Sequence, residues 1–195
     1  RHRIISVDVF APALDHVTLG YEHMLSKGVS LVAKVGRIGL WDTDGFGNGL
    51  VNDGFLVKLG SRHALPRSNK RSNMLGSHPL AGWYLRPELI YSYWAHTDQY
   101  YVYSPFGGPY ETYKETNFYA SAAVNLTVGT QVFLSERICM DFHAGLGYGV
   151  SWRNGVSQPN DDRYRSRENY SFSHLFFGGS SPLCTSGGVL LGYAF

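Results

Sequence analysis

The sequence predicts an all-β fold, a single eight-stranded antiparallel up-and-down β-barrel that crosses a membrane. Long segments alternate apolar residues with polar or small ones, as strands with two unlike faces do. Only 16% of the residues are charged, against about 25% in soluble domains, whereas 15% are aromatic and 23 residues are glycine. Tight turns and long polar loops also alternate along the chain, which is the layout of a membrane barrel.

The composition of the sequence argues against several other classes of protein. Nothing resembling a Pro- or Ser-rich linker divides the chain, so residues 1–195 are expected to form one domain. The sequence has no run of about 18 apolar residues, which excludes a transmembrane helix. The opening residues RHRIISVDVF lack the shape of a signal peptide, so we expect any signal to have been removed. The net charge of +2 is too small for a nucleic-acid partner.

The first four strands are expected at 3–10, 16–25, 29–41 and 54–62. The segment HVTLGYEHML keeps one apolar face, with His23 as its exception near the end. Arg37 falls on the apolar face of VSLVAKVGRIGLW. An arginine facing lipid costs roughly 2–4 kcal/mol at mid-membrane and about 0–1 kcal/mol at an interface, so we expect Arg37 near the outer end.

The last four strands are expected at 81–95, 117–134, 137–152 and 186–195. Every second residue of ICMDFHAGLGYGVSW, from Ile138 to Trp152, is apolar. At about 3.3 Å per residue this stretch spans roughly 50 Å, far more than a soluble strand. Pro87 interrupts GWYLRPELIYSYW, and a proline inside a closed barrel loses a ladder bond, so we expect a bulge or a broken bond there.

The connections indicate which strand ends share a rim. Tight turns, SKG and SER, follow the second and sixth strands, and long loops occupy 42–53, 96–116 and 153–185. Two connections depart from this pattern: APALD is short on the long-loop side, and HALPRSNKRSNMLGSHP, over 63–79, is a long basic excursion on the short-turn side. The even number of strands returns both termini to the short-turn rim, which is periplasmic in an outer-membrane barrel.

A soluble barrel also alternates, but it points its apolar face inward. Here the polar face is rich in Gly, Ser and Thr and has few charges, unlike a soluble surface. Aromatic residues gather toward strand ends, as in the belts at membrane interfaces. One rim is expected to hold Trp83, Tyr193 and Phe195, and the other Trp41, Tyr91, Tyr93, Trp94, Tyr148 and Trp152. These features favour the membrane barrel.

The polar face predicts a charged lumen. It holds Asp8, Glu22, Lys34, Lys58, Arg86, Glu88, Asp141 and His143. An eight-stranded barrel is filled by its side chains, and unpaired buried charges cost several kcal/mol, so we expect a salt-bridged plug. A proton or ion path through Asp141 and His143, or a metal site there, stays open as an alternative, although two ligands are a weak metal signal. No cofactor is expected.

Three segments, LAGWYLRPELIYSYW, MDFHAGLGYGVSW and FFGGSSPLCTSGGVLLGYAF, resemble the small OmpA/OmpX-like outer-membrane β-barrel family of Bacteroidota-type bacteria. The resemblance covers nearly the whole chain and implies a Gram-negative outer membrane, contact with its lipid and lipopolysaccharide, and folding by the barrel assembly machinery. Tyr193 and Phe195 are similar to the aromatic part of the assembly signal of this family, whose fuller form has a glycine where this chain has Leu190.

The cysteines and loops complete the expectations. Cys139 and Cys184 should lie near opposite rims, about 30 Å apart, whereas a disulfide allows roughly 6 Å between Cα atoms. They should therefore not be bonded. Loops on a rigid scaffold are where partners bind. The candidate partner residues are Tyr100, Tyr101, Tyr103, Leu175, Phe176 and Phe177, unless the last three fold over the barrel mouth or dip into lipid.

These observations predict a non-enzymatic structural or interaction protein, such as an accessory subunit of a larger outer-membrane complex. A narrow pore for small solutes is one alternative. The other is a lipid-modifying enzyme that would use Ser173 with His174, or Ser180 and Ser181. The enzyme pattern is thin, because adjacent Ser and His side chains on a strand point apart and the glycine-flanked nucleophile elbow is absent from this segment.

Overall fold

The computed structural model describes residues 2–40, 51–66, 78–102, 111–154, 171–177 and 181–195. Within this part of the chain a 3-10 turn, η1 (Ala11–Leu14), joins the first two strands. The strands are β1 (Arg3–Asp8), β2 (His16–Ser26), β3 (Val29–Ile38), β4 (Val51–Ala64), β5 (Gly82–Val102), β6 (Glu111–Phe133), β7 (Ile138–Asn154), β8 (Leu175–Phe176) and β9 (Leu183–Ala194).

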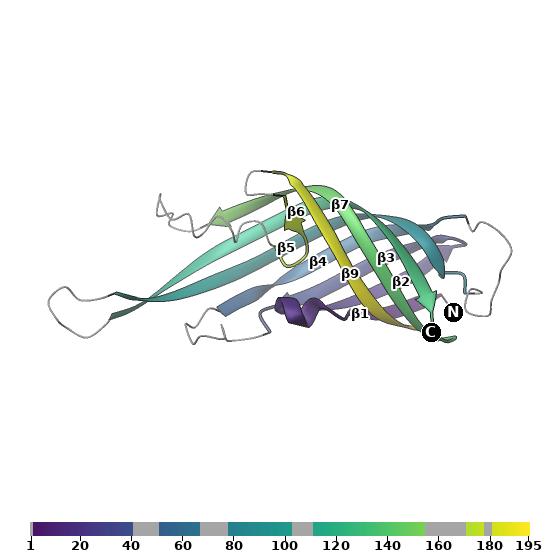
Figure 1. The fold of residues 1–195 in the computed structure, drawn as a ribbon, viewed down its shortest axis with the longest axis horizontal. Coiled ribbons are helices and arrows are strands. Elements are labelled where there is room, and N and C mark those ends of the chain that lie inside the picture. Colours follow the sequence, from purple (N-terminus) through teal and green to yellow (C-terminus); the bar gives the residue numbers. More distant parts are fainter. Residues whose placement is uncertain (1, 41–50, 67–77, 103–110, 155–170, 178–180) are drawn as a thin grey trace.

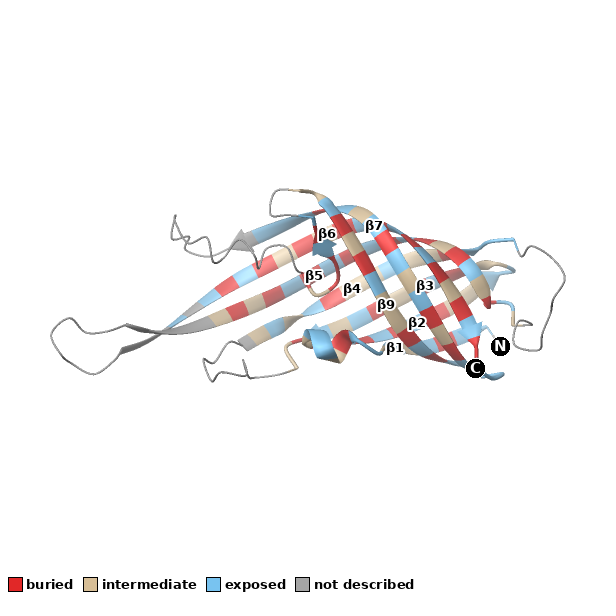
Figure 2. Cartoon of the chain, viewed as in Figure 1, coloured by how far each residue is buried: buried red, intermediate tan, exposed pale blue. Residues whose placement is uncertain are grey.

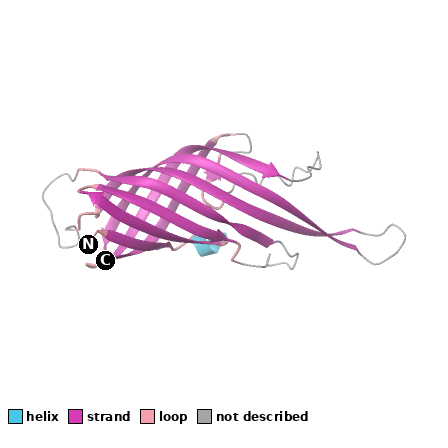
Figure 3. Cartoon of the chain, turned by 180° about the vertical axis from the view of Figure 1, so that it is seen from behind, coloured by secondary structure: helices cyan, strands magenta, loops and turns pink. Residues whose placement is uncertain are grey.

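The strands close into an antiparallel up-and-down barrel (Figure 1). Each long strand pairs with the next along the chain, and β1 pairs with β9 from Ile4 opposite Ala194 to Asp8 opposite Leu190. The two chain ends lie together at one end of the barrel, here named the termini end, and the opposite end is the far end (Figures 1 and 3). The predicted eight-stranded barrel is therefore confirmed, with the two-residue β8 as an addition.

Buried and exposed residues alternate along the strands of the wall (Figure 2), and the exposed ones are largely apolar, whereas many of the buried ones are polar. Along β6, Val124, Leu126 and Val128 are exposed, whereas the alternating Asn125 and Thr127 are buried. The same alternation runs around the barrel, which is the reverse of a soluble barrel. An apolar outer band on a closed antiparallel wall is the surface of a barrel that lies in a membrane.

No helix in the described residues is long and apolar enough to span a membrane.

The hairpin of β5 and β6 is longer than the sequence predicted. The expected strands ended at residue 95 and began at residue 117, but the ladder continues from Thr97 opposite Thr116 to Val102 opposite Glu111. The hairpin projects past the other strands at the far end (Figure 1). Apolar alternation stops near Ala95 because the ribbon leaves the apolar layer there, whereas backbone pairing does not depend on side-chain polarity.

Strand β8 was not predicted, because the sequence assigned all of 153–185 to a loop. It pairs Leu175 with Thr185 and Phe176 with Cys184. This pairing uses the edge of β9 beyond Leu190, where its pairing with the shorter β1 ends. An unpaired sheet edge leaves backbone groups without partners, and β8 satisfies those of this part of β9.

The ladder breaks at Pro87, as predicted. Between β4 and β5, Gly60 pairs with Glu88 and His63 pairs with Leu85, but the two positions between them are unpaired. The register is the same on both sides, so the break is a loss of ladder bonds without a bulge. Proline has no N–H to donate to the neighbouring strand.

Most of the predicted aromatic belt faces outward. Tyr91, Tyr93, Tyr148 and Trp152 are exposed toward the far end, and Trp83, Tyr193 and Phe195 toward the termini end. Trp41 lies outside the described residues. The prediction for Trp94 is wrong, because even-numbered residues of this part of β5 face the lumen and Trp94 is only 6% exposed. It stacks on Tyr119 with ring centroids 5.3 Å apart.

Arg37 and the two cysteines lie where the sequence predicts. Arg37 is exposed near the far end of β3 and lies 3.8 Å from Asp53. Cys139 and Cys184 are free and buried. Cys184 is opposite Gly147, eight residues along β7 from Cys139 and thus about 27 Å away at 3.4 Å per residue. The predicted excursion at 63–79 is partly strand, since β4 continues to Ala64, and residues 67–77 lie outside the described part.

The lumen-facing glycines should tolerate no side chain. A Cβ atom at Gly129 would lie 2.3 Å from the Tyr84 hydroxyl oxygen and 2.8 Å from the Phe142 carbonyl oxygen. Gly129→Leu is expected to lower the free energy of unfolding by about 1–3 kcal/mol or more through overpacking. Urea unfolding of the barrel refolded into lipid vesicles would measure the change.

The matched control is Val128→Leu, on the outward neighbour, which is 43% exposed and should change stability by less than about 0.5 kcal/mol. Equal effects of the two substitutions would contradict the assignment of residue 129 to the lumen.

Candidate functional site in the barrel lumen

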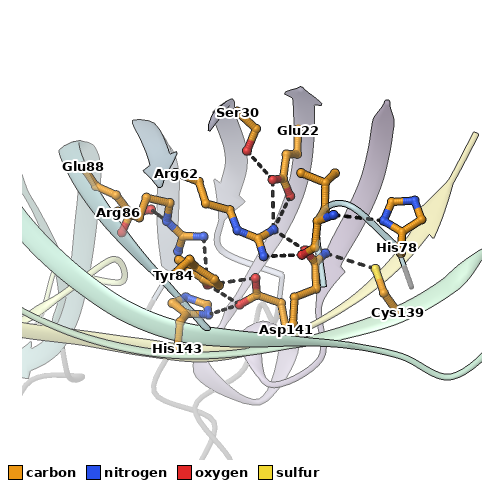
Figure 4. A network of polar contacts seen from close by, with 12 residues as sticks. Glu22, Ser30, Arg62, His78, Tyr84, Arg86, Glu88, Cys139, Asp141 and His143 are labelled. Carbon is orange, nitrogen blue, oxygen red and sulfur yellow. Dashed lines mark hydrogen bonds and ion pairs between the residues drawn. The ribbon is translucent and has the colours of Figure 1, made fainter. Parts of the chain in front are cut away.

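The first group of lumen side chains centres on Arg62 of β4 (Figure 4). Its guanidinium lies 3.0 Å from Glu22 Oε1, also donates to the side chain of Gln131, and donates to the Leu80 carbonyl oxygen at 2.5 Å. Ser30 donates to the same Glu22 carboxylate at 2.5 Å. Arg62 is 2% exposed and Glu22 7%. A buried pair is stable only when its remaining donors and acceptors are also bonded, as most are here.

The second group surrounds Tyr84 of β5. Its hydroxyl donates to the Asp141 carboxylate, with oxygens 2.6 and 2.8 Å away, and accepts a hydrogen bond from Arg86 at 3.2 Å. His143 Nδ1 lies 3.2 Å from the same carboxylate. The guanidinium carbons of Arg62 and Arg86 lie 4.2 and 5.3 Å from the centre of the Tyr84 ring, so this ring connects the two groups.

The third group continues toward the far end. Arg86 Nε lies 2.8 Å from Glu88 Oε1, and Thr127 donates to Glu88 Oε2 at 2.7 Å. Lys34 of β3 is also buried in the lumen, at 2% exposure. Lys58 donates to the carbonyl oxygen of Ser173 at 3.0 Å. Charged groups therefore extend along the lumen, with Lys34 and Lys58 directly opposite one another on β3 and β4 at this level.

A folded-back segment, residues 171–177, closes the far end and is here named the plug segment. Ser92 donates to the Ser171 carbonyl oxygen at 3.0 Å. Phe172, at a φ of 58°, inserts its ring 5.4 Å from that of Trp94, beside the buried Ile38 and Leu56. The plug segment thus contains β8, and its residues before β8 turn into the barrel mouth.

A short apolar segment closes the termini end. Leu80 and Ala81, which precede β5, are buried with Ile4, Phe133 and Ala194. His78 stacks on Phe133 with ring centroids 3.9 Å apart. The charged groups of the lumen therefore lie between two apolar closures, one supplied by the β4–β5 connection and the other by the plug segment.

One cavity among the charged groups of the described residues is small. A cavity of about 10 Å³ lies between Glu22, Arg86, Gln131 and Asp141. A single water molecule requires about this much space, so the cavity can hold one water and no solute.

The structure brings the predicted lumen residues together. Glu22, Lys34, Lys58, Arg86, Glu88, Asp141 and His143 all face the lumen. Asp8 lies at its margin, since its Oδ2 and the His143 ring both border the space that a Cβ atom at Gly188 would occupy. Its Oδ1 accepts hydrogen bonds from the backbone N–H groups of Phe10 and Ala11, so the same carboxylate also satisfies the turn that follows β1.

Sequence reasoning missed Arg62 and Tyr84 as lumen residues, and it placed Gln131 on the polar face of its segment without a role. Both missed residues had a signal, because Arg62 shares the parity of Lys58 on β4 and Tyr84 shares that of Arg86 and Glu88 on β5. Strand parity alone would have placed both in the lumen.

The candidate partner residues take different places. The side chains of Tyr100 and Tyr101, and the whole of Tyr103, lie outside the described residues. Leu175 and Phe177 are exposed. Phe176 is buried at 6% exposure against Ile90, Ala123 and Cys184, because adjacent residues of β8 face opposite sides of the wall. Phe176 therefore fills the lumen and is a correction to the predicted contact surface.

The Ser173–His174 pair lies within the plug segment. Ser173 Oγ is 2.9 Å from His174 Nδ1, and both residues are buried. Burial, followed by the positive charge of Lys58, lowers the pKa of His174 to about 4, so this imidazole is neutral at pH 7. Its Nε2 atom is buried without a hydrogen-bond partner in the described residues, so no carboxylate orients it as in a catalytic triad. Ser180 lies outside the described residues, and Ser181 Oγ accepts a hydrogen bond from the Leu183 backbone N–H.

The Asp141–His143 pair is poorly suited to a metal. Among the described residues, no group of three or more His, Cys, Asp or Glu side chains could hold a metal ion. Arg86 and Tyr84 occupy the space beside the Asp141 carboxylate, and a guanidinium repels a cation.

Comparisons with known proteins add a likeness of low identity. No family model matches the chain, and no curated protein matches it. Among solved structures, the chain is similar to the N-terminal β-barrel domain of Pseudomonas aeruginosa OprF, with 13% identity, a TM-score of 0.39, and coverage of 100% of this chain and 96% of that one.

Removing one member of the Arg62–Glu22 pair should destabilise the barrel strongly. Arg62→Met leaves Glu22 buried and unpaired, and the free energy of unfolding is expected to fall by about 3–5 kcal/mol. The double variant Arg62→Met with Glu22→Leu should recover part of this loss, because it removes both buried charges. Urea unfolding in lipid vesicles would measure all three proteins.

The exposed pair Arg37–Asp53 provides the control, with side chains 72% and 73% exposed, so Arg37→Met should cost about 0–1 kcal/mol. If Arg62→Met cost no more than Arg37→Met, the network would not be what stabilises the lumen.

Proposed function

We propose that this chain is an integral outer-membrane β-barrel with a closed lumen, acting as a structural or interaction protein without catalytic activity. One observation supports this proposal above the others. The lumen contains the buried ion pairs Arg62–Glu22 and Arg86–Glu88 between two apolar closures, with a cavity of about 10 Å³ beside them. A barrel filled in this way offers its outer wall and its projecting strands to partners, and not its interior.

The outer-membrane location follows from the kind of barrel. An even number of tilted antiparallel strands, an apolar outer band and aromatic residues toward both ends are typical of bacterial outer-membrane barrels. In this orientation the termini end is periplasmic and the β5–β6 hairpin extends outside the cell. Tyr193 and Phe195, both outward-facing on or beside β9, would present the aromatic signal to the assembly machinery.

A pore for small solutes is less favoured than a closed barrel. An ion crossing the barrel would have to pass the plug segment, the Arg86–Glu88 pair, the Arg62–Glu22 pair and the closure at Leu80. Each pair would have to separate in a lumen with almost no water to replace the lost contacts, and separating buried ion pairs costs several kcal/mol.

A lipid-modifying enzyme is also less favoured. Ser173 and His174 are 5% and 3% exposed and lie inside the mouth, so lipid in the surrounding membrane has no access to them. The hydroxyl of Ser173 is already bonded to neighbouring groups of the plug segment and to Ser92. These contacts fit a serine and a histidine that hold the plug segment in place.

The projecting hairpin is the part of the fold best placed to meet a partner. Its strands, Gly82–Val102 and Glu111–Phe133, are the longest of the described part of the barrel. The sequence at this end of the hairpin contains Tyr100, Tyr101 and Tyr103, and tyrosine is a residue type enriched at protein interfaces. With the exposed Leu175 and Phe177 near the same end, this surface would suit an accessory subunit of a larger outer-membrane complex.

Reconstituted protein should be electrically silent. Planar bilayers that contain the purified wild-type barrel are expected to show no steady channel, because the lumen is filled by paired side chains. Folding would be checked by the heat-dependent shift of the band on a denaturing gel, and an outer-membrane porin reconstituted in parallel would serve as the conducting control. A stable open channel in folded wild-type protein would overturn the closed-lumen proposal.

The interaction role predicts a partner in the native membrane. Gentle detergent extraction, followed by purification through a tag inserted within residues 42–53, should retain a second membrane protein in stoichiometric amount. Replacing Tyr100, Tyr101 and Tyr103 together by serine should remove this partner while the barrel still folds. If the barrel is recovered alone from the wild-type membrane as well as from the variant membrane, the accessory role is contradicted and a purely structural role is left.

A further inference from the structure

The outer wall contains an apolar groove near the termini end. It crosses strands β1 to β6 and has a volume of about 760 Å³, within the range of sites that hold small organic ligands. Outward-facing Tyr21, Ala33, Leu59 and Leu89 lie side by side across it, since the strand register places each opposite the next. The groove therefore opens on the lipid-facing surface, and its floor reaches the inward-facing Val32, Gly60 and Glu88 of the wall.

Local sequence and backbone explain why the wall is hollow here. Ala33 and Ser61 are small, whereas the exposed leucines around them, Leu31, Leu59 and Leu89, are large. The broken ladder at Pro87 lies in the same place, so the wall between β4 and β5 is less tightly paired there. A groove bounded by large apolar side chains, with small residues at its centre, has the shape for an extended hydrocarbon chain.

One end of the groove has two basic side chains, those of Arg3 and His23. Arg3 of β1 lies opposite His23 of β2 at the side nearest the chain ends. Arg3 is exposed and forms no ion pair with any described residue. His23 stacks on Tyr21 at 6.5 Å between ring centroids, and its Nδ1 atom is buried without a hydrogen-bond partner. An exposed guanidinium without a partner is a group that binds a phosphate, and a neighbouring imidazole can donate to the same phosphate from its other ring nitrogen, Nε2.

We propose that this groove binds one anionic glycerophospholipid from the leaflet at the termini end of the barrel. An acyl chain would lie across Tyr21, Ala33, Leu59 and Leu89, and the phosphate would accept hydrogen bonds from Arg3 and His23. The level of Arg3 and His23 is two residues closer to the rim than that of Tyr21, about 7 Å, as expected for a headgroup above its chain.

Charge favours a lipid over a second copy of the barrel. Among the described residues, the outward-facing carboxylates Asp53 and Glu136 lie near the far end and in the turn after β6, and Asp53 is already beside Arg37. A second barrel packed on this groove would therefore bring apolar residues, and no carboxylate of the band, to Arg3 and His23. A phospholipid supplies both the chain and the anion.

The site rests on the proposed membrane location and is tested with the full chain folded in detergent micelles. Native mass spectrometry after addition of phosphatidylglycerol and phosphatidylcholine with the same acyl chains, in equal amounts, would count the lipids retained. We expect one phosphatidylglycerol per barrel, retained about fivefold over phosphatidylcholine, which is the effect of one arginine at a charged membrane surface.

Two variants and two matched controls test the geometry. Ala33→Trp fills the groove and should abolish retention of either lipid, whereas Val35→Trp, two residues along the same outward face, should not. Arg3→Gln should remove the preference for phosphatidylglycerol, whereas Arg37→Gln, at the far end, should leave it. The heat-dependent gel shift would establish that each variant is folded.

The outcomes separate this site from the wider proposal. Equal retention of the two lipids by the wild type, or unchanged retention in Ala33→Trp, would overturn the lipid site while leaving the membrane barrel intact. A dimer that disappears in Ala33→Trp would overturn it in favour of a second copy. Failure of the wild type to insert into phospholipid vesicles would contradict the membrane location and the lipid site together.

Discussion

The buried ion pair between Arg62 and Glu22 is the contact on which the rest of the lumen depends. A barrel with an apolar outside has to place its polar residues inside, and eight strands leave room for little besides side chains. Arg62 joins four parts of the chain: Glu22 of β2, Gln131 of β6, the ring of Tyr84 of β5 and the Leu80 carbonyl oxygen of the closing segment. Because strands on opposite sides of the barrel bond to this one group, their relative positions are fixed.

The closures at the two ends follow from the same constraint. Charges in a lumen are costly unless their partners stay in place, and entering water would compete for the same hydrogen bonds. At one end Leu80 and Ala81 cover the Arg62 group, and at the other Phe172 packs against Trp94 above Lys58 and Ser92. Both closures come from connections between strands. The loops therefore contribute to the core of this barrel, in addition to any contact they make outside it.

The outer wall and the lumen have separate roles in this arrangement. The ion pairs of the lumen join its strands to one another, so substitutions there act mainly on stability. The outer wall has the exposed Arg3, which forms no ion pair with any described residue, and the projecting β5–β6 hairpin lies beyond the apolar band. Recognition of lipid or protein would thus be located outside the barrel, on a scaffold made rigid by its interior.

The sequence by itself determined the barrel, because the two-residue period of a strand assigns each side chain to a face without knowledge of its neighbours. That period placed Glu22, Arg86, Glu88 and Asp141 in the lumen and anticipated the broken ladder at Pro87. The same two-residue period is also sufficient to place Arg62 and Tyr84 in the lumen.

Tertiary structure alone decided which charges meet and what closes the ends. Arg62 bonds to Gln131, 69 residues away, because curvature brings β4 and β6 together across the lumen, and no local pattern encodes that distance. Strand β8 forms because β1 is too short to cover the whole edge of β9, and Asp8 shares its carboxylate between the turn after β1 and the margin of the lumen. Each of these outcomes depends on contacts between segments far apart in the chain, which sequence periodicity does not contain.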